Sequence, residues 1–197
     1  MLAAVILSGG ESSRMGSPKA LVPLGPGGQT FLEHLLEITR QPEIGWTRIV
    51  LGKHSEEISR ALSLDPASIV VNPDWKLGQI SSIQAAIRSL PAGETSGVML
   101  FLVDHPLISS ALVAKLVAEF NAAARPIVIP TFQGKRGHPV IFAERLYDEL
   151  LAASPDQGAR EVVWAHANEV HEVPTDEEGI ILNLNSPEAL RQALNRP

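Results

Sequence analysis

A short apolar run that ends in a glycine-rich loop constrains this fold more than any other feature of the chain. Residues 3–7 are Ala-Ala-Val-Ile-Leu, which predicts a buried strand, and residues 8–19 hold three glycines and two cations. Such a loop presents backbone N–H groups without side chains in the way, a surface that suits phosphate oxygens. In an α/β chain the loop after the first strand lies at the carboxyl edge of the sheet, where ligands bind. The sequence therefore predicts an anion site here.

The segments that follow alternate between helical and strand patterns, which is typical of a parallel sheet. Thr30 with Glu33 three residues later is a capping-box pattern, and Ser186 with Pro187 is a second helix start. We expect strands at residues 46–51, 68–71, 97–103, 126–132, 140–142, 169–173 and 179–184, and helices at 31–38, 55–62, 81–90, 109–124, 143–152, from about 156, and from 187.

Composition sets the class of protein. The 197 residues suffice for one domain with a full core, and 45% hydrophobic with 19% charged residues favours a folded globular chain. The net charge of -6 gives no general attraction to nucleic acid or to an anionic membrane, and no stretch approaches a membrane span. With no cysteine, a disulfide or a thiolate nucleophile is excluded. We expect a cytoplasmic protein without nucleic-acid or membrane partners.

The loop differs from two common phosphate motifs. It lacks the Gly-Lys-Ser/Thr ending of a Walker A loop, and it lacks the dinucleotide pattern G-x-G-x-x-G. Arg14 offers a planar fork of donors and Lys19 a mobile point charge. The alternative for such a loop is a solvated turn.

The residues Ser8-Gly9-Gly10-x-Ser12-Ser13-Arg14-Met15-Gly16-x-Pro18-Lys19 carry a resemblance. They are similar to the signature loop of nucleotidyltransferases that activate small phosphorylated molecules, above all the molybdenum cofactor cytidylyltransferases and guanylyltransferases of the MobA-like family. The resemblance implies a Rossmann-like, three-layer α/β/α fold with a mostly parallel, mixed sheet, in a single domain over residues 1–197. It also implies that the nucleotide contacts Leu7, Ser8, Gly9, Gly10, Ser13, Arg14 and Lys19.

A second motif follows the third expected strand. Asn72-Pro73-x-Trp75-x-x-Gly78-x-x-Ser81-Ser82 resembles the segment that lines the nucleotide pocket in the cytidylyltransferases. The resemblance adds Asn72, Gly78, Ser81 and Ser82 to the nucleotide-binding set, at a helix start that suits an anion or a polar base edge. On turn chemistry alone, Asn-Pro could simply turn the chain and Trp75 could fill an apolar gap.

Asp104 directly follows the most apolar expected strand, at the same sheet edge as the loop. Mg²⁺ prefers oxygen ligands and is usually held by one or two carboxylates plus phosphates, so Asp104 is a candidate ligand. The alternative is that Asp104 only caps a turn. The family has an Asp-x-Pro motif here, often with Gln in the middle, so His105 is a departure. Near the end of the chain Asn183 and Asn185 stand where the family commonly has aspartates. The resemblance implies Mg²⁺ held by Asp104 and Asn185, and it also places Asp104 in the nucleotide-binding set.

Two further motifs resemble the acceptor side of the family's site. The first is Gly134-x-x-Gly137-His138-Pro139-Val140, whose two glycines and two cations before an apolar strand predict a hairpin tip. The alternative is that this tip is only solvated surface. Asp156-x-Gly158-Ala159-Arg160 resembles a later motif, in which Arg160 binds the acceptor phosphate or pairs within the fold. The resemblance implies an acceptor site of His105, Gly137, His138 and Arg160.

The implied reaction is transfer of a nucleoside monophosphate from a triphosphate to the phosphate of a molybdopterin-type acceptor, with CTP favoured over GTP. Arg14, Lys19 and Asp104 are the expected catalytic residues, and a molybdoenzyme is a possible recipient of the product. Three alternatives stay open. They are another phosphorylated acceptor such as a sugar phosphate, a non-catalytic cofactor or nucleotide binding and delivery protein, and a generic α/β domain without a small-molecule site.

Overall fold

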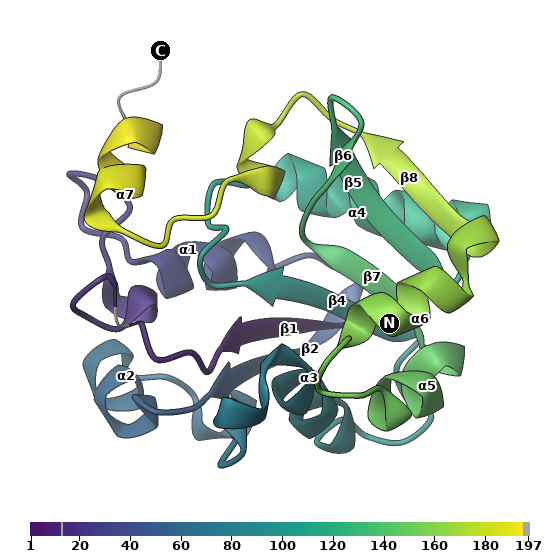
Figure 1. Cartoon of the computed structure of the whole chain (residues 1–197), viewed down its shortest axis with the longest axis horizontal. Coiled ribbons are helices and arrows are strands. Elements are labelled where there is room, and N and C mark those ends of the chain that lie inside the picture. Colours follow the sequence, from purple (N-terminus) through teal and green to yellow (C-terminus); the bar gives the residue numbers. More distant parts are fainter. Residues whose placement is uncertain (13, 195–197) are drawn as a thin grey trace.

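The computed structural model describes residues 1–12 and 14–194, which form an α/β domain around one eight-stranded sheet (Figure 1). The strands are β1 (Leu2–Ser8), β2 (Ile44–Leu51), β3 (Ile69–Val71), β4 (Gly97–Leu102), β5 (Ile127–Phe132), β6 (Lys135–Arg136), β7 (Val140–Ala143) and β8 (Val170–Pro174). The helices are α1 (Phe31–Ile38), α2 (Ser55–Leu62), α3 (Gln79–Arg88), α4 (Ser110–Ala123), α5 (Tyr147–Ala152), α6 (Ala159–Ala165) and α7 (Pro187–Leu194).

The sheet has a parallel half and a mixed half. Strands β3, β2, β1 and β4 lie side by side and run parallel, and the register pairs Leu7 of β1 with Val50 of β2 and Leu102 of β4. Strand β7 then pairs antiparallel with both β4 and β5, while β8 runs parallel to β5 and β6 closes a hairpin. Because β1 and β4 end level with each other, the loops that follow them meet at one edge of the sheet.

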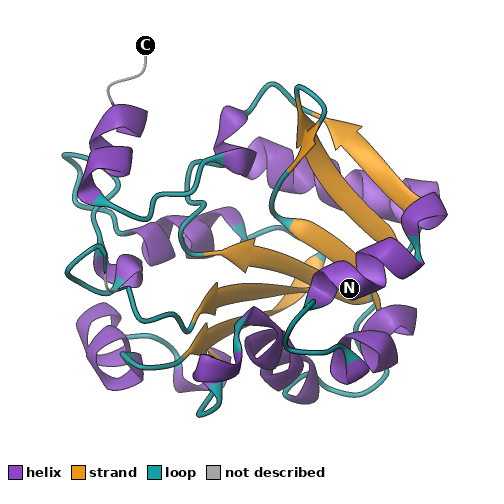
Figure 2. Ribbon diagram, viewed as in Figure 1, coloured by secondary structure: helices purple, strands orange, loops and turns teal. Residues whose placement is uncertain are grey.

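Helices cover both faces of the sheet, which makes three layers (Figure 2). Side chains alternate along β1, so that Ala4 and Ile6 pack with α1 and α4, whereas Ala3 and Val5 pack with α3, α5 and α6. All seven residues of β1 are buried, as expected of a strand covered on both sides. The expected fold class is therefore confirmed.

Helix starts follow the sequence signals closely. The Thr30 hydroxyl accepts a hydrogen bond from the Glu33 N–H, while the Glu33 carboxylate accepts one from the Thr30 N–H at 2.8 Å, a complete capping box. Ser109 caps α4 through the Leu112 N–H at 3.0 Å, and the Ser186 hydroxyl accepts from the Ala189 N–H at 3.2 Å. These caps fix where the site loops end and the helices begin.

One expected strand is wrong. Residues 179–184 do not join the sheet; they begin in a 3₁₀ turn, Glu178–Ile181, and continue as an extended connection. Their backbone groups bond to separate loops, since the Ile180 carbonyl accepts from the His138 N–H at 3.0 Å and the Leu184 N–H donates to the Asp104 carbonyl at 2.7 Å. An apolar run thus acts as a strap that ties the last segment to the loops after β4 and β6.

No helix in residues 1–12 and 14–194 is both long enough and apolar enough to cross a membrane.

Candidate active site

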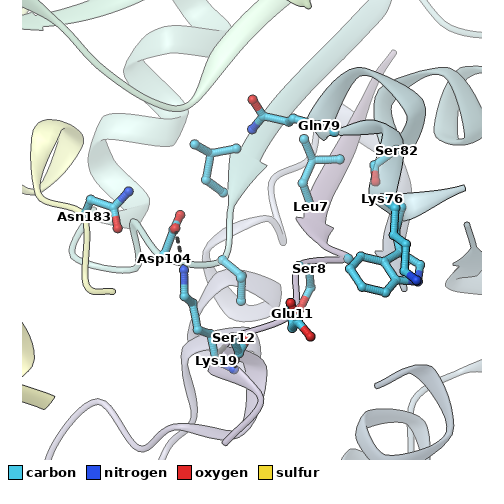
Figure 3. A pocket seen from close by; sticks show the side chains of 16 residues that line it. Leu7, Ser8, Glu11, Ser12, Lys19, Lys76, Gln79, Ser82, Asp104 and Asn183 are labelled. Atoms are coloured by element: carbon cyan, nitrogen blue, oxygen red, sulfur yellow. Dashed lines mark hydrogen bonds and ion pairs between the residues drawn. The ribbon is translucent and has the colours of Figure 1, made fainter. Parts of the chain in front are cut away.

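A cavity of about 820 Å³ opens at the carboxyl ends of β1 and β4, where the two loops meet (Figure 3). One wall is the glycine loop after β1, and the opposite wall is the Trp75–Leu77 turn with the start of α3. Asp104 and Asn183 close a third side. Eight of the residues predicted to bind nucleotide line it: Leu7, Ser8, Gly9, Gly10, Lys19, Gly78, Ser82 and Asp104.

A charged cluster occupies one end of this cavity. The Lys19 ammonium donates to Asp104 Oδ2 at 2.9 Å and also contacts the amide oxygen of Asn185 (Figure 3 shows the pair with Asp104). The side chains of Lys19 and Asp104 are 17% and 18% exposed, so the pair is largely shielded from bulk water. The Lys19 N–H in turn donates to the Ser12 hydroxyl at 3.1 Å, which folds the glycine loop back on itself.

Asn72 and Ser81 support the cavity from behind and do not line it. The Asn72 amide donates to the hydroxyls of Ser81 and Ser82 at 2.9 and 3.0 Å, and its oxygen accepts from the Asp74 N–H at 3.0 Å. All three of these side chains are buried, and only Ser82 reaches the cavity surface. Within this motif, Ser82 lines the cavity, whereas Asn72 and Ser81 hold the wall in place.

Arg14 lies on the surface of the glycine loop, exposed and outside the residues that line the cavity. Ser13, also predicted to bind nucleotide, lies outside the described residues.

Several lining residues were not predicted from sequence. Glu11, Ser12, Trp75, Lys76, Gln79 and Asn183 all line the cavity. The Lys76 ammonium lies 5.6 Å from the centre of the Trp75 ring, which places a cation beside a flat aromatic surface. Gly52 was missed as well: a Cβ there would collide with the Gly9 carbonyl and lie 2.9 Å from Trp75, so only glycine lets these two walls approach. Trp75 belongs to the motif of residues 72–82 and could have been predicted from it, whereas Gly52 lies in no motif that would have indicated its role.

A second cavity, of about 520 Å³, adjoins the first and shares Leu7, Gln79 and Leu102 with it. Its floor is the apolar face of strands β1, β4, β5 and β7, and its rim is the segment before and along α6. Three of the predicted acceptor residues line it: Gly137, His138 and Arg160. Trp164, which sequence reasoning did not single out, lies at this cavity with 61% of its surface exposed.

His105 is packed behind this second cavity and does not line it. Its Nδ1–H donates to the Ile180 carbonyl at 3.2 Å, and its ring centre lies 5.3 Å from that of His138. Burial lowers the pKa of His105, an effect that the nearby Asp104 carboxylate opposes. Burial, with a smaller effect of His105, lowers the pKa of His138 to about 4. His138 is therefore neutral at neutral pH.

Comparison with known proteins places these cavities in context. A model of the MobA-like NTP transferase domain matches residues 4–170. The chain is 30% identical over 168 residues to nicotine blue oxidoreductase of Paenarthrobacter nicotinovorans, covering 79% of this chain and 78% of that protein. It is also 30% identical over 212 residues to the molybdenum cofactor guanylyltransferase of Rhizobium meliloti, covering 96% of this chain and 89% of the relative.

Among solved structures, Rv0371c from Mycobacterium tuberculosis H37Rv superposes with a TM-score of 0.84 at 24% identity, covering 100% of this chain and 99% of that chain. A structure of Rv0371c in complex with manganese gives a TM-score of 0.77 at 23% identity, with the same coverage. These likenesses support the fold, and the sequence relatives support the family.

Proposed function

The chain belongs to the family of MobA-like NTP transferase domains, and we propose that it moves a nucleoside monophosphate from a nucleoside triphosphate to the phosphate of a molybdopterin-type acceptor. The observation that carries this proposal is the pair of adjoining cavities, one polar with the Lys19–Asp104 cluster and one with an apolar floor. A triphosphate and a partly apolar acceptor can lie side by side across their shared wall. The name of the Rhizobium meliloti relative supports the choice of acceptor.

In the proposed reaction an oxygen of the acceptor phosphate attacks the α-phosphorus of the triphosphate. The new P–O bond joins the two phosphates, and the bond to the β-phosphate breaks with its electron pair leaving on pyrophosphate. A phosphate monoester has a second pKa near about 6, so the nucleophile is already largely ionised at neutral pH and needs no general base. The neutral His138 fits such a site, where the protein works by positioning and charge neutralisation.

The residues divide this work by position. Gly9 and Gly10 bring backbone N–H groups to the triphosphate, and Lys19 supplies the nearby charge. Arg14 stands at the surface, so its proposed contact needs the glycine loop to turn inward around the ligand. Across the shared wall, His138 and Arg160 contact the acceptor.

Magnesium is part of the proposal, and the donor atoms fit it. Asp104 offers a carboxylate and Asn185 an amide oxygen, both hard donors, and both already converge on one cation, the Lys19 ammonium. No group of three or more His, Cys, Asp or Glu side chains that could hold a metal occurs among residues 1–12 and 14–194. The site therefore suits an ion that takes most of its ligands from phosphates and water. When bound, Mg²⁺ would neutralise charge on the triphosphate and the departing pyrophosphate.

The base of the triphosphate is the finer part of the proposal. The motifs downstream of the first loop favour CTP, whereas the Gly9–Gly10 pair is closer to some guanylyl members, and the relative from Rhizobium meliloti is named a guanylyltransferase. CTP and GTP are therefore the two triphosphates that the assay must compare.

The test is pyrophosphate release by the purified protein with Mg²⁺ and molybdopterin, offered CTP, GTP, ATP and UTP separately. We expect release with one of the first two and its loss in Asp104→Ala, because that variant removes the carboxylate of the cluster. Release with a sugar phosphate in place of molybdopterin would move the activity to the alternative acceptor.

No release with any acceptor, together with molybdopterin binding shown by calorimetry, would replace the transferase with a binding and delivery protein. One relative is named nicotine blue oxidoreductase, so conversion of nicotine blue is assayed in parallel. If the transferase is confirmed, a pull-down of molybdoenzymes with the product-loaded protein tests the proposed recipient.

A further inference from the structure

The Lys19 ammonium stands where the two metal donors converge. Its Nζ lies 2.9 Å from Asp104 Oδ2 and in contact with Asn185 Oδ1, so it already uses one oxygen from each proposed ligand. Other hydrogen bonds hold these residues in place. Lys19 starts a 3₁₀ turn, and its backbone N–H donates to the Ser12 hydroxyl, while the Leu184 N–H, next to Asn185, donates to the Asp104 carbonyl at 2.7 Å. The contact is therefore a built arrangement of three segments far apart in sequence.

The charges of this cluster balance without any added ion. Lys19 contributes one positive charge and Asp104 one negative charge, while Asn183 and Asn185 contribute none. The other carboxylate that lines the cavity, Glu11, is paired with Lys53. A divalent cation approaching Asp104 in the free protein thus meets a neutral cluster with an ammonium already in the ligand position, and like charges repel strongly at such distances.

We propose that Lys19 is a resident counter-cation that keeps a divalent metal off Asp104 until a triphosphate is bound. The triphosphate offers the ammonium a stronger set of acceptor oxygens, which draws Nζ away and frees Asp104 Oδ2 and Asn185 Oδ1. Binding order follows: the free protein holds metal weakly, and triphosphate and metal each strengthen the binding of the other by the same factor. The inference rests on the proposed function for the triphosphate and for Asp104 and Asn185 as metal ligands.

The experiment measures Mn²⁺ binding directly, by loss of the free-ion signal in electron paramagnetic resonance, with no acceptor present and no turnover. The variants are Lys19→Met, which vacates the ligand position, and Asn185→Asp, which adds a carboxylate while keeping Lys19. We expect each to bind Mn²⁺ at least about tenfold more tightly than the unmodified protein, given the strength of unit charges at short range. Lys76→Met is the matched control, because it removes the same charge from another wall of the same cavity.

Adding the non-hydrolysable α,β-methylene analogue of CTP or GTP completes the cycle. After subtraction of the Mn²⁺ that the analogue binds in a protein-free control, Mn²⁺ affinity of the unmodified protein should rise at least about tenfold. The advantage of Lys19→Met should then shrink to less than about threefold, because Lys19 has already left Asp104. Far-UV circular dichroism and thermal melting check that each variant is folded.

The inference is overturned if folded Lys19→Met binds Mn²⁺ no more tightly than the unmodified protein. It is also overturned if Lys76→Met gains as much Mn²⁺ affinity as Lys19→Met, since the gain would then come from the overall charge of the cavity and not from the position of Lys19. Should Lys19→Met fail to fold, unchanged Mn²⁺ affinity in Asn185→Asp is the overturning result. Because no arm requires transfer chemistry, these outcomes are separate from failure of the proposed function.

Discussion

The two adjoining cavities are built on opposite principles. The first is made of loops and a helix start around a charged cluster, whereas the second rests on the apolar face of strands β1, β4, β5 and β7 and holds a neutral histidine. One suits a polyanion whose charge must be matched, and the other suits a body with apolar surface that must be oriented. A substitution at either cavity should therefore change the binding of one substrate and leave the binding of the other largely unchanged.

The largest effect is expected at the charged cluster. Asp104→Asn keeps the shape of the side chain but removes the charge, so the turnover number for pyrophosphate release should fall by about 10³-fold, in the range that removal of an electrostatic catalytic group produces. Glu11→Gln is the matched control, because it neutralises the other carboxylate of the same cavity, one that is paired with Lys53 at its exposed rim. A comparable loss in Glu11→Gln would contradict a special role for Asp104.

The second cavity depends on a close backbone approach at Gly137. A Cβ there would collide with the carbonyl and side chain of Ile180, on the strap that follows β8. Gly137→Ala should lower the free energy of unfolding by about 3 kcal/mol, because backbone has to move. Urea unfolding measures this, with Gly27→Ala as the control, since nothing lies within 4 Å of a Cβ at Gly27. Equal stability of the two variants would mean that the strap is not tightly packed.

Burial of His138 should make stability depend on pH. Its pKa is lowered to about 4 from an ordinary value of 6.5, so between these values the unfolded chain binds a proton that the folded chain does not. Stability is therefore lost as pH falls from about 6.5 toward 4, by up to about 3 kcal/mol for this group. In His138→Asn the loss over this window should be smaller, as measured by urea midpoints at several pH values. Parallel pH profiles for the two proteins would show that His138 titrates normally.

We expect the smallest effects from replacing the one tryptophan that lines each cavity. Trp164 lies at the second cavity and Trp75 at the first, and each offers a flat surface. Trp164→Leu should raise the KM for the acceptor by about fivefold, and Trp75→Leu the KM for the triphosphate by a similar factor, in line with the ~1 kcal/mol of an aromatic contact. Steady-state kinetics with each substrate varied in turn gives both values. If both variants changed the KM of the same substrate, the assignment of one substrate to each cavity would be wrong.

Prediction from sequence worked best where a signal is local. The strand β1, the capping box at Thr30 and the cap at Ser186 depend on residues close together in the chain, and all are present. The loop after β1 and Asp104 after β4 share an edge because parallel strands end together. Eight of the predicted nucleotide residues line one cavity for this reason.

Sequence reasoning does not reveal hydrogen-bond partners that are distant in the chain. The apolar residues 179–184 read as a strand, yet their backbone groups bond to the loops of Asp104 and His138. Asn72 and Ser81 read as ligand-binding residues, yet they are buried and bonded to each other. Similarly, His105 lies behind the second cavity, because its Nδ1–H finds the Ile180 carbonyl.

The α/β alternation and the resemblance to the MobA-like family could be recognised from the sequence alone, since both depend on periodicity and on residues close together in the chain. Tertiary structure alone decided which polar groups face a ligand and which face each other. It joined Lys19 to Asp104 and Asn185, and it placed two cavities on either side of Leu7, Gln79 and Leu102. The physical reason is that hydrogen bonds and ion pairs are short-ranged in space, whereas their partners here lie up to 166 positions apart.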